Sequence, residues 1–176
     1  MKNKGLIWGA IASLFSLLLI LPLCLGSWVY YVGNNVSEES LGLFADWSNA
    51  ENAFKVLDKT FPTFWAKFVG ILAIIALVAG VLFVLLYVLD LTKVTKPGKT
   101  DLLKKILGAV MIICAVAAVV AILVFNGNAK YTTPVTNTVT GYKALFSPWL
   151  IPIFAALGGA TAMLSACGKK TSKKRK

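Results

Sequence analysis

Four long apolar runs dominate the sequence and limit the folds open to it. They cover about residues 5–32, 65–91, 106–125 and 148–167. Each is long enough for a transmembrane helix, which needs about 20 consecutive apolar residues. The composition agrees, because 58% of the residues are hydrophobic and only 14% are charged, an unusual balance for a soluble domain. We therefore expect an all-α membrane protein in which residues 1–176 form one antiparallel bundle of four transmembrane helices.

The segments between the runs are short. Two loops, at 33–64 and 126–147, lie on one side of the membrane, and a loop at 92–105 and a tail at 168–176 lie on the other. Threonine and valine alternate over residues 135–140, a pattern typical of strands. Residues 28–36 either extend the first helix or form a strand that pairs with this segment in a small outer sheet, and the sequence leaves both open.

Basic residues are concentrated on one side. Two lie at the amino terminus, five in the loop at 92–105 and six in the tail, whereas the other side has five, balanced by five acidic residues. Positively charged flanks are retained in the cytoplasm. We therefore expect both termini to be cytoplasmic, in a protein of the cell membrane. The net charge of +11 then reflects topology and does not indicate a nucleic-acid partner.

A cleaved signal peptide is the competing interpretation of the first run. Lys2 and Lys4 precede it, and small residues at Cys24 and Gly26 match a cleavage site. The run is longer than the 7–15 apolar residues typical of signal peptides, and it continues past Trp28. These features favour a retained helix.

Small residues spaced four apart recur in the apolar runs. In lipid, helices associate through close packing, which favours such residues at their contacts. The residues expected to pack helices are Gly5, Gly9, Ala76, Gly80, Gly158 and Ala162. We expect them to pack the bundle itself, and a homo-oligomer interface is the alternative.

The sequence offers little for catalysis. It has no histidine and three cysteines without a CxxC motif, which argues against thiol redox centres and cysteine-rich zinc sites. The hearts of the four runs carry no charge, and Asp90, at the end of the second run, is expected to pair with Lys93 or Lys104. We therefore predict no catalytic, metal-binding or cofactor-binding residue, and no enzyme.

The basic tail is expected to lie on anionic headgroups of the inner leaflet. Each basic residue near such a surface contributes about 1 kcal/mol of attraction. The residues concerned are Lys169, Lys170, Lys173, Lys174, Arg175 and Lys176.

The first outer loop carries the most distinctive pattern. Trp47 and Phe54 share one face of a predicted short amphipathic helix. Together with a tryptophan at the exit of the first run, a Gly-Leu-aromatic triplet and a basic residue at the start of the second run, this loop resembles that of the claudin and peripheral-myelin-protein superfamily. The matching residues are Trp28, Gly42, Leu43, Phe44, Trp47 and Lys67. The two loop cysteines of that family are absent.

The resemblance implies an adhesion, barrier or auxiliary-subunit role exerted through the outer loops. We accordingly expect a non-enzymatic membrane protein that acts in contact, in assembly or as an accessory subunit. Its expected partners are the lipid bilayer and either another copy or a different membrane protein. The alternative is a small channel or transporter subunit that works as an oligomer.

Overall fold

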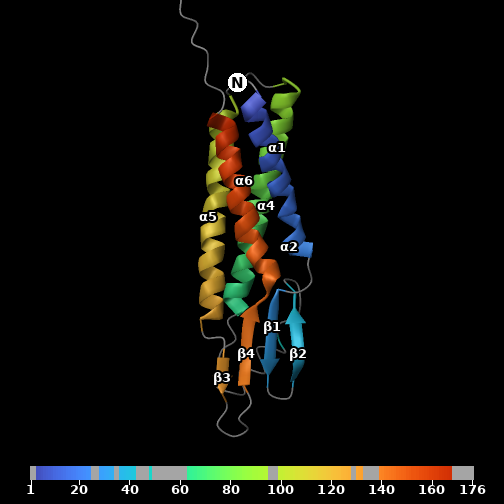
Figure 1. The fold of residues 1–176 in the computed structure, drawn as a ribbon, viewed down its shortest axis with the longest axis vertical. Helices are drawn as coiled ribbons and strands as arrows, with labels where there is room; N and C mark the ends of the chain where they lie inside the picture. The colour runs from blue at the N-terminus through green and yellow to red at the C-terminus, as the bar shows by residue number, and fades with distance from the viewer. Residues whose placement is uncertain are drawn as a thin grey trace, which may run out of the picture.

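The protein is a four-span membrane bundle with a small sheet at one end (Figure 1). The computed structural model describes residues 3–24, 28–33, 36–42, 48, 63–94, 99–127, 130–132 and 139–167. Its helices long and apolar enough to cross a membrane are Gly5–Cys24, Thr63–Leu91, Asp101–Asn126 and Phe146–Cys167. The expected bundle of four transmembrane helices is confirmed. We call the end that carries the sheet the sheet end, and the end where Asn3 and Cys167 lie the terminal end.

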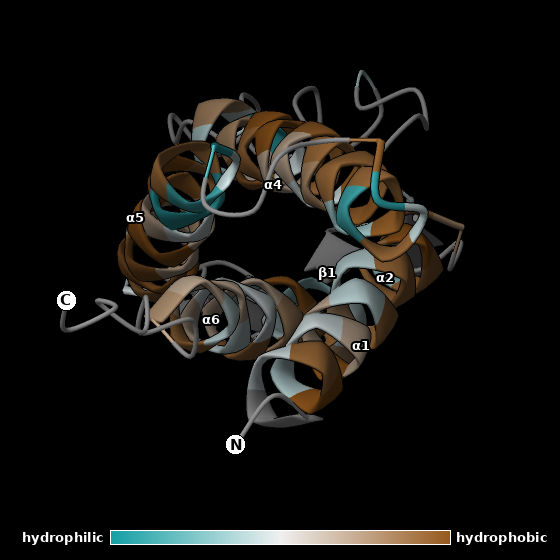
Figure 2. Ribbon diagram, turned by 90° about the horizontal axis from the view of Figure 1, so that it is seen from above, coloured by the Kyte–Doolittle hydropathy of each residue, from teal (hydrophilic) through white to brown (hydrophobic). Residues whose placement is uncertain are grey.

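The helices form a ring, seen from the terminal end in Figure 2. Helix α1 (Asn3–Leu18) contacts both α4 (Thr63–Leu91) and α6 (Phe146–Cys167), and α5 (Asp101–Asn126) lies between α4 and α6. The inside of the ring is filled by buried side chains, among them Ala12, Ala73, Phe83, Met111, Ala118 and Ala155. Large apolar side chains such as Leu14, Ile71 and Ile113 are exposed on the outside, as lipid-facing residues should be.

The first span ends earlier than the sequence indicated. Helix α1 stops at Leu18, a short helix α2 covers Ile20–Cys24, and strand β1 occupies Val29–Gly33, so the predicted span 5–32 is wrong at its sheet end. Pro22 explains the interruption, because it has no N–H to donate to the carbonyl of Leu18. The other three predicted spans agree with the structure to within five residues; the largest difference is that α5 begins at Asp101.

The two segments that join the spans at the sheet end build one antiparallel sheet. Its strands are β1, β2 (Val36–Leu41), β3 (Lys130–Thr132) and β4 (Val139–Ala144), in the order β2-β1-β4-β3. In the central pair, Val29 lies opposite Ala144 and Val32 opposite Gly141. The structure thus shows that residues 29–33 form a strand. Because β1 pairs with β4, the segment after the first span and the segment before the fourth span share one sheet.

Small residues lie where the helices approach most closely. A Cβ atom on Gly80 would lie 2.8 Å from the Ser16 Cβ of α1, and one on Gly158 would lie 2.6 Å from the Met111 Cε of α5. A Cβ on Gly5 would lie 3.3 Å from the Ser165 carbonyl of α6, and one on Gly9 would overlap the Tyr87 ring of α4. Ala76 and Ala162 are fully buried. The six residues expected to pack helices therefore all lie inside one bundle.

The tightest backbone approach involves a glycine that the sequence analysis missed. A Cβ on Gly159 would lie 2.5 Å from the carbonyl oxygen of Gly108, and one on Gly108 would lie 2.7 Å from that of Gly159. Gly108 is not part of the small-residue pattern, because the residues four positions away on either side are a lysine and an isoleucine. Its role becomes visible only when α6 is packed against α5.

Candidate functional site

The candidate contact surface is the sheet end, where residues of both predicted outer loops fold together. Sheet and bundle meet at Trp28, which is 1% exposed. Its indole Nε1 donates a 2.7 Å hydrogen bond to the Pro22 carbonyl. Because α2 ends at Cys24, that carbonyl lacks the donor that a further helical turn would supply. The indole thus stabilises the end of the span and turns the chain into β1.

Trp28 is one of the expected outer-loop contact residues, and its burial corrects that expectation. A tryptophan next to a membrane span is commonly an interfacial anchor, but here the chain folds back on itself. The Trp28 carbonyl accepts a 3.0 Å hydrogen bond from the Leu145 N–H, which fixes it beside the start of α6. The residue therefore supports the sheet and does not form its surface.

Further hydrogen bonds attach the sheet to the bundle. The Asn126 Oδ1, in the last turn of α5, accepts a 2.8 Å bond from the backbone N–H of Ala144 in β4. The Ser147 hydroxyl of α6 donates a 3.3 Å bond to the Pro22 carbonyl of α2. The first bond attaches the sheet to the third span, and the second joins the first and fourth spans beside it.

The junction between sheet and helices is also well filled. The gap among Trp28, Val69, Ile122, Phe125 and Pro148 measures about 10 Å³, roughly the space of one water molecule. A junction filled and hydrogen-bonded in this way holds the sheet in one orientation relative to the membrane. The sheet can therefore act as a preformed surface.

Aromatic side chains cluster at the start of α4, at the sheet end of the bundle. The Phe64 and Phe68 rings stack at 5.8 Å, and the Trp65 ring meets Phe64 edge-on at 5.4 Å. Phe64 is 67% exposed, and Phe146, at the start of α6, is similarly exposed. Such rings are enriched at the membrane–water boundary. We infer that the membrane–water boundary lies where the sheet joins the helices.

The predicted contact residues have different positions in the structure. Lys67 is exposed on α4, in the turn that carries Phe64 and Phe68, and Gly42 is half-buried directly after β2. Four others, Leu43, Phe44, Trp47 and Phe54, lie outside the described residues, as do the six basic residues of the tail. The structure thus brings Trp28 and Lys67 to the same end of the bundle, one inside and one outside.

Charge differs between the two edges of the sheet. Strand β2 carries Glu38 and Glu39, whereas β3 carries Lys130 and β4 carries Lys143. Since β2 and β3 are the edge strands of the described sheet, acidic residues belong to one edge strand, and basic residues belong to the opposite edge strand and its neighbour.

The part of the chain that the structure describes has no group of three or more His, Cys, Asp or Glu side chains placed to hold a metal ion. Cys24, Cys114 and Cys167 are free thiols.

Comparison of the chain with protein-family models, with curated proteins and with solved structures gives no match. The functional inference therefore rests on the geometry and chemistry of the described residues.

Proposed function

We propose that this multi-pass membrane protein is non-enzymatic and acts by contact, as an assembly or accessory subunit that binds another membrane protein through its sheet end. One observation carries the proposal: both sheet-end segments contribute strands to a single sheet that Trp28 and Asn126 attach to the spans. A sheet that is fixed next to the membrane suits a binding role. The resemblance of the first outer loop to claudin-type proteins supports the same role.

The filled interior supports contact over conduction through a single chain. Phe83, Met111 and Ile151 are fully buried between the helices, and alanines fill the remaining space. Passage of an ion would require these side chains to move apart. The alternative function, a small channel or transporter, would therefore need a pathway between several copies.

The proposal places the sheet outside the cell and both termini in the cytoplasm. The excess of lysine and arginine at the terminal end supports this orientation. A membrane-impermeant thiol reagent tests it in a variant whose natural cysteines are replaced by alanine. A cysteine at Ser37 should be labelled in intact cells, and one at Thr95 only after permeabilisation. The reverse pattern would overturn the orientation.

Site-specific crosslinking tests the contact proposal. A photoreactive residue at Lys67 should capture a membrane protein in intact cells, and the same residue at Lys105 provides the control. Both lysines are exposed on a helix, but they lie at opposite ends of the bundle. Equal capture from both positions would contradict a specific sheet-end contact.

Flux through liposomes tests the alternative function. The contact proposal predicts that purified protein leaves the permeability of liposomes to ions and small solutes unchanged. The Lys67→Glu variant should no longer co-purify with the partner, and that permeability should stay unaltered. Conduction by the wild-type protein at any copy number would favour the channel interpretation.

A further inference from the structure

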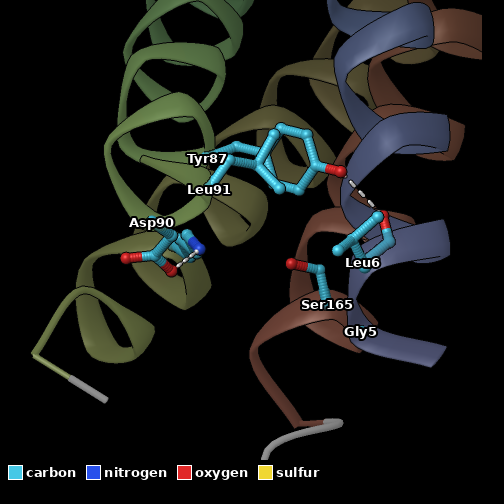
Figure 3. Close-up of a pocket in the computed structure, with 7 residues that line it drawn as sticks. Gly5, Leu6, Tyr87, Asp90, Leu91 and Ser165 are labelled. Carbon is cyan, nitrogen blue, oxygen red and sulfur yellow. Dashed lines mark hydrogen bonds and ion pairs between the residues drawn. The ribbon is translucent and has the colours of Figure 1, made fainter. Parts of the chain in front are cut away.

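The terminal end contains a polar pocket that the contact function does not use. It is a half-open space of about 110 Å³, and all four spans contribute to its lining. Its polar residues are Tyr87 and Asp90 from α4, Lys104 from α5 and Ser165 from α6, as Figure 3 shows for those that it labels. A polar space of this size has room for several water molecules or for one small polar group.

Lys104 is the positively charged residue of the pocket, and its side chain is only 3% exposed. Its Nζ lies 2.5 Å from the Asp90 Oδ2, while the Asp90 Oδ1 accepts a 2.9 Å hydrogen bond from the Thr100 hydroxyl. Asp90 thus holds the ammonium at the pocket wall. A lysine ammonium has three donors, and within the described residues Asp90 is the acceptor recorded for it. The remaining donors are available to an acceptor in the pocket.

Ser165 is a second donor without a protein acceptor. The residue is 4% exposed, and its hydroxyl has no hydrogen-bond partner among the described residues. In Figure 3 this hydroxyl points from α6 into the pocket, on the side that faces Asp90 and Tyr87. Two buried donors from different helices therefore face one space, which is the arrangement that an anionic oxygen requires.

A glycine on α1 allows Tyr87, which lines the pocket, to pack closely against that helix. The Tyr87 hydroxyl donates a 2.9 Å hydrogen bond to the Leu6 carbonyl of α1. This is possible because Gly9 has no Cβ, which would otherwise overlap the Tyr87 ring. The pocket is therefore a built feature of the α1–α4 contact.

The edge of the pocket is apolar and faces lipid. Leu6 is 52% exposed and Leu91 is 45% exposed, and both line the pocket. Leu91 is the last residue of α4, so the pocket lies at the level where phospholipid headgroups meet the hydrocarbon core. A polar interior with an apolar rim at this depth matches a molecule that has both parts.

We propose that this pocket binds the phosphate group of a phospholipid from the leaflet at the terminal end. The phosphate oxygens accept hydrogen bonds from Lys104 and Ser165, and the acyl chains lie against Leu6 and Leu91. Asp90 keeps the site electrically neutral before binding, because it balances Lys104. Each phosphate carries one negative charge, but a zwitterionic headgroup such as phosphoethanolamine also brings an ammonium, which the Asp90 carboxylate attracts. Phosphoethanolamine therefore fits better than an anionic headgroup such as phosphoglycerol.

Native mass spectrometry of the full chain with added phosphatidylethanolamine tests this site. Ser165→Ala should weaken binding about threefold to tenfold, as expected for the loss of one hydrogen bond. The double variant Asp90→Leu with Lys104→Met should weaken it more, without leaving an unpaired buried charge. Ser13→Ala is the matched control, since the Ser13 hydroxyl donates to the Gly9 carbonyl outside the pocket, and it should bind as the wild type does.

Three further phosphate compounds test whether the pocket binds a lipid or a free phosphate. Soluble glycerophosphoethanolamine and inorganic phosphate should compete weakly, because they lack acyl chains. Phosphatidylglycerol, whose headgroup lacks the ammonium, should bind less tightly to the pocket. Equal lipid binding by wild type, Ser165→Ala and the double variant would overturn the proposal. Full competition by inorganic phosphate would overturn the lipid assignment.

Discussion

The two halves of the bundle are packed in different ways. In the sheet half, large side chains fill the interior, and seven of the nine largest fully buried side chains lie there: Trp28, Val29, Leu19, Pro22, Ile122, Phe125 and Ile151. The other two, Phe83 and Met111, lie just beyond the middle of α4 and α5. In the terminal half, the helices approach closely at glycines. The six helical glycines at which a Cβ would lie within 3.4 Å of another helix are Gly5, Gly9, Gly80, Gly108, Gly158 and Gly159, and all belong to that half.

The difference extends to the polar groups. At the sheet end, the Pro22 and Trp28 carbonyls are satisfied by donors from within the protein, and the gap at the junction measures about 10 Å³. At the terminal end, a buried ion pair borders a pocket of about 110 Å³. Close packing and complete hydrogen bonding suit a rigid surface for a protein partner. A polar space at the other end suits a small ligand from the membrane.

Loss of Trp28 should have the largest effect on stability. Trp28→Ala removes a fully buried indole and its hydrogen bond to Pro22, and it should lower the free energy of unfolding by about 3–5 kcal/mol. Unfolding in mixed detergent micelles measures this change. Trp8→Ala is the control, because Trp8 is 37% exposed on α1 and should change stability much less. Equal losses would show that the sheet end does not depend on its junction.

Breaking the ion pair should be the next largest effect, at the other end. Lys104→Met leaves Asp90 buried without its counter-charge and should cost about 3 kcal/mol, the lower end of the usual range, because the pocket admits water. Adding Asp90→Leu should restore most of that stability. Exposed Lys105 provides the control, since Lys105→Met should stay within about 0.5 kcal/mol of wild type. A double variant as unstable as the single one would contradict this account.

Close approach at glycine predicts a smaller loss in the terminal half. Gly159→Ala places a Cβ 2.5 Å from the Gly108 carbonyl oxygen, so the helices must separate, at a cost of about 1–3 kcal/mol. Gly127→Ala is a matched control, because Gly127 has a helical φ of −61° and lies beyond the bundle contacts. If Gly159→Ala left stability unchanged, packing in this half would not depend on glycine.

The smallest effect concerns Ser16, in the middle of the bundle. Its hydroxyl is fully buried and has no hydrogen-bond partner in the described part of the chain, a situation that costs free energy. Ser16→Ala should therefore stabilise the protein by up to about 1 kcal/mol, measured as above. Ser13→Ala, which removes a bonded hydroxyl, should bring no such gain. A loss of stability in Ser16→Ala would mean that the hydroxyl has a partner after all.

Much of the architecture follows from the order of the residues along the chain. Four apolar runs predicted four spans, because length and hydrophobicity are local properties. The small-residue pattern predicted six positions in helix contacts, although it could not say which helix would face which. Gly108 escaped this reasoning, because it is isolated in its own helix and meets Gly159 only across a contact between α5 and α6.

The candidate sites were harder to predict than the spans. The sequence placed Trp28 at the membrane boundary but could not show that Pro22 would end the helix and turn the indole inward. For Asp90 it offered Lys93 or Lys104 as partners, and the structure selects Lys104. Both outcomes depend on how the chain turns between the paired residues, which periodicity and composition do not specify.

The sequence by itself determined that this chain is a four-span membrane protein, because crossing lipid requires long apolar helices whatever their neighbours. Its uneven charge also predicted which side each loop should occupy. Only the tertiary structure decided that the sheet-end segments form one sheet and that Lys104 and Ser165 border a common pocket. The physical reason is that hydrogen bonds between strands and contacts between helices join residues from about ten to more than a hundred positions apart, and no local pattern records such pairs.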